Sequence, residues 1–215
     1  MTAVRVLAAT ITAMVLTSVG TAWAGAPTDQ LRGRVDRVLR VLEDPTLKQD
    51  GRAADRRAAI RTIAHEIFDF RELSQRALAR HWQARTAAER DEFVRLFADL
   101  LERSYIGKIE MFSGGDRIQY TGEALDGDQL AVVRTRIVTK NGTEIPVDYR
   151  LHQVADRWLV YDVAIEGVSL VANYRAQFNK IIQRSSFQQL IAQLAAKKDE
   201  VQDTEGSLAK KASQK

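Results

Sequence analysis

Histidine and acidic residues are the first candidates for chemistry in this sequence, which has three His and no Cys. His65-Glu66 resembles the start of a zinc-binding helical motif. The position that needs the second histidine, four residues further on, is Asp69. His81 and His152 are far from it in the chain. The spacing therefore predicts no metal site, and a solvated or helix-capping histidine is the ordinary role for each.

The acidic residues likewise form no recognisable catalytic motif. Asp126-Gly127-Asp128 resembles part of a calcium loop but lacks the closing glutamate, so it predicts a β-turn. The sequence has no nucleophile elbow, P-loop, dinucleotide fingerprint or cysteine nucleophile. We expect no catalytic residue and no cofactor. If the protein were an enzyme, Asp69 and Asp162 would be the candidate acids.

The N-terminus has the pattern of a secretory signal peptide. Arg5 precedes an uncharged apolar run over residues 6–19, and Ala22 and Ala24 occupy the −3 and −1 positions of a cleavage site. The run is shorter than the ~20 residues of a membrane-spanning helix, and the chain has no cysteine for a lipid anchor. We expect residues 1–24 to be removed and the remaining chain to lie in the periplasm.

Charge argues against nucleic acid as a partner. The chain has a net charge of +4, but its basic residues alternate with acidic ones throughout. This mixture is typical of a solvated surface.

Apolar residues at helical spacing predict helices over residues 29–42, 52–67, 73–82 and 86–109. The last of these begins with a capping box, Thr86-Ala87-Ala88-Glu89, and ends near Gly114. After the strands, two more helical segments are expected over 169–182 and 187–194, with Ser185-Ser186 between them. Beyond residue 197 the chain is polar and charged, so residues 198–215 are predicted to be disordered.

Between these helices the pattern changes to a period of two. Strands are expected over residues 117–120, 129–139, 144–153 and 158–165, with Asn141-Gly142 as a hairpin turn. The alternation puts Arg134 and Arg136 on a polar face, and it puts Trp158 and Asp162 on one face of the last strand. The sequence thus predicts one α+β domain, residues 25–197, with a twisted four-stranded antiparallel sheet packed by helices on one face.

The helices and strands carry more apolar residues than one buried face of each would require. They form stripes on the helix after Thr86, on the inward strand faces and on the helix after Ser169. These stripes form either a filled core or a core left open as a pocket, and the pattern fits both.

The segment from Trp158 to Phe178 reads Trp-Leu-Val-Tyr-Asp-Val-Ala-Ile-Glu-Gly-Val-Ser-Leu-Val-Ala-Asn-Tyr-Arg-Ala-Gln-Phe. Together with Phe68-Asp69-Phe70 and the run from Ile145 to Leu151, it resembles the MlaC-type family. These are the toluene-tolerance or maintenance-of-lipid-asymmetry phospholipid-binding proteins of the periplasm. The resemblance covers about residues 28–197. Leu78-Ala79 departs from the Leu-Gly of many members, and Ser185-Ser186 stands where a glycine is common.

The resemblance implies an NTF2-like shape with a deep cavity for acyl chains and no catalytic residue. It implies that the protein carries phospholipid, or a hopanoid-type lipid as the second choice. The partners implied are an outer-membrane lipoprotein complex and an inner-membrane ABC transporter with a ring-shaped lipid-binding subunit. Nine residues are expected to contact the lipid tails: Phe93, Phe97, Tyr105, Ile109, Tyr149, Val163, Val171, Tyr174 and Phe178.

Two other functions fit the same pattern. An NTF2-like isomerase or hydratase would need a buried acid with a raised pKa, such as Asp69 or Asp162. A ligand-free periplasmic adaptor or chaperone would have a filled core and would bind through its surface.

Overall fold

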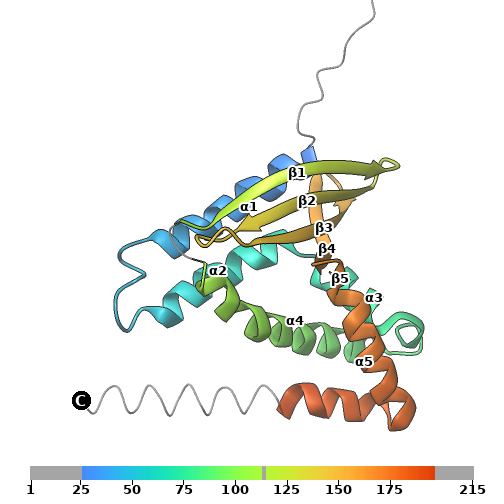
Figure 1. Ribbon diagram of the computed structural model, residues 1–215. Coiled ribbons are helices and arrows are strands. Elements are labelled where there is room, and N and C mark those ends of the chain that lie inside the picture. Colours follow the sequence, from blue (N-terminus) through green and yellow to red (C-terminus); the bar gives the residue numbers. More distant parts are fainter. Residues whose placement is uncertain (1–25, 113–114, 197–215) are drawn as a thin grey trace, which may run out of the picture.

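The protein is a layered α+β molecule, described by a computed structural model over residues 26–112 and 115–196 (Figure 1). Helices precede and follow an antiparallel sheet, as the sequence predicts. The expected signal peptide and the expected C-terminal tail lie outside the described residues. Within the described ranges, no helix combines the length and apolar character needed to cross a bilayer.

The sheet has five strands in the order of the chain, each antiparallel to the next. They are β1 (Arg117–Asp126), β2 (Leu130–Val138), β3 (Glu144–Val154), β4 (Arg157–Ile165) and β5 (Val168–Ser169). The two-residue strand β5 was not predicted, because Val168-Ser169 is too short to show a pattern. β1 is also longer than expected, since a bulge at Thr121 interrupts its alternation.

The hairpin between β2 and β3 confirms the Asn-Gly prediction. Gly142 adopts a positive φ of 81°, which glycine tolerates without steric cost. The turn is closed by hydrogen bonds from Thr139 N to Thr143 O (2.9 Å) and from Gly142 N to Thr139 O (2.8 Å).

A second bulge corrects one sequence prediction. The β3–β4 register shifts between Arg150 and Leu151, so Tyr161 is an extra residue on β4. Trp158 therefore lies on the inner face with Leu151, whereas Asp162 pairs with Arg150 on the outer face. The two residues lie on opposite faces because a bulge reverses the alternation of the strand beyond it.

The helices before the sheet are α1 (Ala26–Glu43), α2 (Ala53–Ile67), α3 (Phe70–Leu78), the 3₁₀ turn η1 (Ala79–His81) and α4 (Ala87–Glu110). The predicted capping box is present: Thr86 accepts a hydrogen bond from Glu89 N, and the Glu89 carboxylate accepts one from Thr86 N. α5 (Leu170–Arg184) follows the sheet with Ser169 as its N-cap. The break at Ser185 and a helix over residues 187–196 are also as predicted.

Ala79 shows why a glycine is favoured after Leu78. Its backbone has φ 49° and ψ −120°, a conformation that is costly for any residue with a Cβ. We expect Ala79→Gly to relieve this strain and raise the melting temperature by about 2–4 °C, a gain of about 1 kcal/mol. The matched control, Ala176→Gly on the exposed face of α5, should lower it by a similar amount because it weakens a regular helix. Thermal unfolding followed by circular dichroism measures both. If both variants destabilised the protein, the interpretation that the Ala79 backbone is strained would be contradicted.

Two hydrophobic clusters hold the molecule together. One lies among α3, α4, α5 and the helix over 187–196, and it is built around Phe93, Phe97 and Phe178. The other lies between the inner face of the sheet and α1 and α2, and it includes Leu31, Val133 and Val160. Among the described residues, only the side chain of Phe68 packs against both. The apolar core is therefore divided between a helical layer and a sheet layer.

Candidate lipid-binding site

The inner face of the sheet is well covered at one end. Here Leu31 of α1 packs on the strands, and Val133 and Leu151 are both 0% exposed. Ala131, Trp158 and Val160 of the same face are also buried. This half of the sheet is an ordinary filled core.

The other end of the same face is not fully covered. Four apolar residues near the β2–β3 hairpin are only partly buried, although their strand positions point them to the same side as the filled half. We call them the open half of the sheet: Ile137, Ile145, Tyr149 and Ile165. These four residues are less completely buried than Val133, although Thr135 and Val147 between them are 3% and 4% exposed, so this end of the face is covered incompletely.

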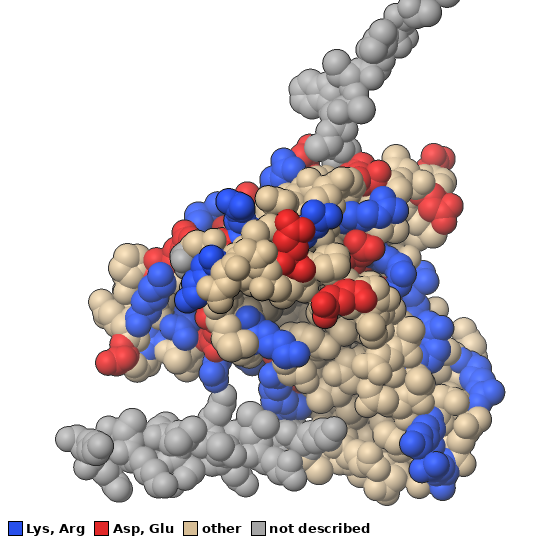
Figure 2. Space-filling model, in the orientation of Figure 1, with Lys and Arg blue, Asp and Glu red and all other residues tan. Residues whose placement is uncertain are grey.

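α4 shows the same change along its length. Its first half is packed: Phe93 and Phe97 are fully buried, and their rings meet the Phe178 ring edge-on at 5.5 and 4.9 Å between centroids. In its second half Tyr105 is partly buried, and Ile109 is 38% exposed. α4 passes beneath the sheet (Figure 1), and Figure 2 shows this face of the molecule hollowed between the two. The apolar second half of α4 and the open half of the sheet border this hollow.

Tyrosine hydroxyls supply polar groups in this region. Burial and the neighbouring Tyr174 hydroxyl, which is hydrogen-bonded to Tyr105, raise the pKa of Tyr105. Burial raises the pKa of Tyr149 to about 12, partly offset by a hydrogen bond from Thr135. Burial also raises the pKa of Tyr120, whose hydroxyl is enclosed without a hydrogen-bond partner. All three remain neutral at physiological pH, so they offer hydrogen bonds and apolar rings rather than charge.

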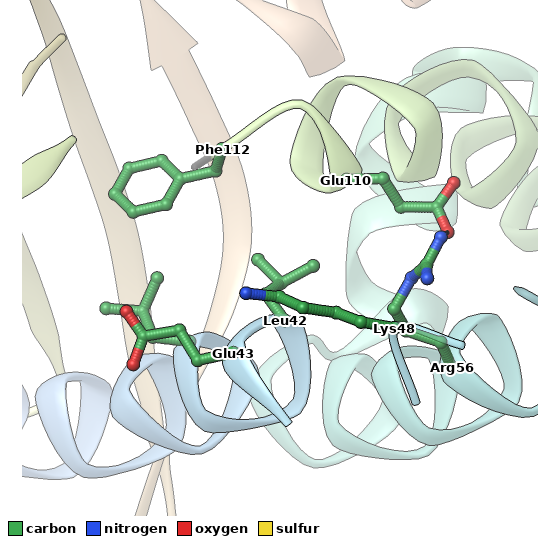
Figure 3. A pocket seen from close by; sticks show the side chains of 7 residues that line it. Leu42, Glu43, Lys48, Arg56, Glu110 and Phe112 are labelled. Carbon is green, nitrogen blue, oxygen red and sulfur yellow. Dashed lines mark hydrogen bonds and ion pairs between the residues drawn. The ribbon is translucent and has the colours of Figure 1, made fainter. Parts of the chain in front are cut away.

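A pocket of about 210 Å³ lies at the end of the hollow where α1, α2 and α4 meet. It is lined by three apolar residues, Leu39, Leu42 and Phe112, and by four charged residues, Glu43, Lys48, Arg56 and Glu110. Figure 3 shows the Lys48 side chain extending across the pocket toward Glu43 and Phe112. The pocket thus offers a cation beside apolar groups.

Ion pairs join α4 to α2 next to this pocket. Glu110 accepts hydrogen bonds from Arg56 (2.9 Å) and Arg57 (3.0 Å). Glu102, about two turns earlier, is paired with Arg61 (2.5 Å) and His65 (3.0 Å). The α2–α4 seam is therefore polar, unlike the interfaces inside either hydrophobic cluster.

The predicted tail-contact residues fall into three groups. Phe93, Phe97, Val171 and Phe178 lie inside the filled helical cluster, and Val163 is buried in the sheet cluster. Tyr105 and Tyr174 are partly buried against the helical cluster and Tyr149 against the sheet cluster, while Ile109 is exposed on α4.

The sequence analysis did not include Ile137, Ile145 or Ile165 among the site residues. Strand alternation was the signal that could have found Ile137 and Ile145, whereas the face of Ile165 depends on the bulge at Tyr161. The alternation does not show how far α1 extends over the inner face.

The two acids considered for catalysis have structural contacts. Asp162 is 3% exposed and accepts hydrogen bonds from Arg150, Ser169 and Val171 N at 2.5, 2.6 and 3.0 Å, which fixes the start of α5 to the sheet. Asp69 caps α3 by accepting from Glu72 N and is hydrogen-bonded to His152 at 3.1 Å. Among the described residues no group of three or more His, Asp and Glu side chains could hold a metal ion.

An antiparallel sheet whose inner face is incompletely covered at one end, opposite apolar residues of a helix, suits a protein that binds an apolar ligand. The model of the MlaC protein family matches residues 32–196, and the chain belongs to this family. This confirms the resemblance seen in the sequence.

Two relatives extend the comparison. The chain is similar to the intermembrane phospholipid transport system binding protein MlaC of Haemophilus influenzae, with 24% identity over 123 residues; the match covers 55% of this chain and 57% of that protein. It is also similar to a phospholipid-binding protein from Ralstonia solanacearum, whose structure was solved in complex with a phospholipid. That likeness has a TM-score of 0.72 and 26% identity, and it covers 81% of this chain and 97% of the other.

Proposed function

We propose that this protein is a periplasmic phospholipid carrier that holds acyl chains between the open half of the sheet and the second half of α4. The partial burial of Ile137, Ile145, Tyr149 and Ile165 carries this proposal, because it marks an apolar surface that the rest of the chain covers incompletely. Each CH₂ group removed from water contributes about 0.8 kcal/mol, so acyl chains would bind there strongly. Family membership and the phospholipid bound to the Ralstonia solanacearum relative support the same ligand class.

The polar groups suit a carrier better than an enzyme. Asp69 and Asp162 are occupied by structural hydrogen bonds and do not line the open half. Hydrophobic contact is non-directional, so we expect loose preference among acyl chains. Within the proposal, the carrier receives and delivers lipid between an outer-membrane lipoprotein complex and an inner-membrane ABC transporter with a ring-shaped subunit.

Native mass spectrometry of the full chain, exported to a bacterial periplasm and purified without detergent, tests this function. We expect a mass increment that extracts as phospholipid, on a protein shortened by cleavage after Ala24. An increment that extracts as a hopanoid would change the lipid class. A protein mass alone, with no uptake from phosphatidylethanolamine vesicles, would overturn the carrier and favour the adaptor or enzyme.

A further inference from the structure

The C-terminal part of the domain has an unusual charge pattern. No Asp or Glu occurs between Gly167 and Lys198, so α5 carries only basic charges: Arg175, Lys180 and Arg184. All three are exposed. Figure 2 shows basic side chains along the lower right edge of the molecule, around the end of α5 and the helical segments beside it, with no acidic side chain among them. This differs from the mixed charge elsewhere.

Basic residues in other parts of the protein commonly have acidic neighbours. Arg71 pairs with Asp91 at 2.7 Å and Arg136 with Glu144 at 3.0 Å, and Arg37 pairs with Glu66. Within the described part of the chain, the three basic residues of α5 make no such ion pair. Their charges are therefore left for an external acidic group.

Neighbouring contacts fix part of this surface. Arg80 and His81 of η1 contact the side-chain oxygen of Asn179 at 2.7 and 3.0 Å. Arg175 donates from Nε to the carbonyl of Arg76 at 2.9 Å, although the residue as a whole is exposed. We call Arg80, Arg175, Lys180 and Arg184 the basic face. Side chains held in place lose less entropy when they bind a partner.

A hollow of about 300 Å³ lies on the same surface. It is lined by Gln177, Lys180, Ile181 and Arg184. Two cations and an amide would bind a carboxylate, while Ile181 would contact the methylene groups of a glutamate side chain. The hollow thus has the chemistry to receive an acidic side chain.

The distribution of apolar residues favours a protein partner over a bilayer. The apolar side of α5, with Val171 and Phe178, is buried in the helical cluster. The exposed side offers cations between polar groups such as Asn173 and Gln177, so α5 has no apolar edge to insert among lipids. Arginine and amide side chains make directional hydrogen bonds, which suit the fixed carboxylates of a folded protein.

We propose that the basic face is a docking surface for a protein partner that presents a cluster of aspartate and glutamate side chains. This surface lies on α5 and η1, away from the open half of the sheet. The proposal does not depend on whether the open half of the sheet carries lipid.

Binding to an immobilised oligoglutamate peptide tests the proposal with the full chain. The variant Arg175→Glu/Lys180→Glu/Arg184→Glu should lose at least about tenfold in affinity. The control Arg40→Glu/Arg134→Glu/Lys140→Glu makes the same change in net charge at exposed positions elsewhere, and should stay within about threefold of the unchanged protein. A third variant, Arg175→Gln/Lys180→Gln/Arg184→Gln, removes the charges without adding repulsion and should also bind the peptide weakly.

Equal losses in the first variant and its control would overturn the proposal, because binding would then follow net charge alone. Unchanged binding by both α5 variants would also overturn it. Vesicles of phosphatidylglycerol serve as the second probe. If the α5 variants weakened vesicle binding but not peptide binding, the surface would be a membrane contact instead. Circular dichroism and melting temperature show that each variant is folded.

Discussion

The substitution Ile145→Glu should prevent the protein from retaining lipid. Ile145 belongs to the open half of the sheet, opposite Ile137 on β2. A carboxylate there would have to leave water when acyl chains bind, at a cost of several kcal/mol. We expect Ile145→Glu to lower the phospholipid that co-purifies with the protein by at least about tenfold. Because Ile145 is only partly buried, the melting temperature should fall by no more than a few degrees.

Val154→Glu is the matched control for this prediction. It places the same charge on the same strand, at an exposed position. Phosphorus analysis of lipid extracts, normalised to protein, measures both variants. Full lipid content in Ile145→Glu would place the acyl chains elsewhere. Equal loss in both variants would mean that added charge, and not its position, controls lipid content.

Asp162→Ala should give the largest loss of stability among single substitutions considered. The buried carboxylate accepts hydrogen bonds from Arg150, Ser169 and Val171 N, and the variant would leave these donors without an acceptor. Since the Arg150 side chain is partly exposed, we expect a loss of about 3 kcal/mol rather than the full value for a buried pair. The melting temperature should fall by about 6–12 °C.

Urea unfolding of Asp162→Ala and Asp148→Ala measures the difference. Asp148 lies on the same outer face of the sheet, so its removal should change stability by less than about 0.5 kcal/mol. Unchanged stability with loss of lipid in Asp162→Ala would contradict the anchoring role and make Asp162 a ligand contact. Selective loss of an enzymatic turnover would support the isomerase or hydratase instead.

Local patterns predicted the elements well because their causes are local. The Asn141-Gly142 turn, the Thr86–Glu89 capping box and the Ser169 cap each depend on residues a few positions apart. The bulge at Tyr161 was missed because a strand of apolar residues alternates plausibly in either register. As a result, Asp162 was wrongly predicted to share a face with Trp158.

The site could be predicted only in part. The apolar stripe of α4 was recognised, but the same stripe is filled at Phe93 and open at Tyr105. Likewise, the inner face of β2 is filled at Val133 and open at Ile137. The difference depends on where α1 and α5 end against the sheet, which residues distant in the chain decide. Hydrophobic pattern shows which side of an element is buried, but not what covers it.

The order of the strands has a consequence for folding. Each strand pairs with the next one in the chain, so β1 to β5 can associate through short loops at little entropic cost. α1, by contrast, must reach strands about a hundred residues later, as in the hydrogen bond from Arg34 to the carbonyl of Trp158. Short-range pairings form faster than long-range ones. We therefore expect the sheet to assemble early after export and α1 to dock late, so that the filled half of the inner face is completed only at the end of folding.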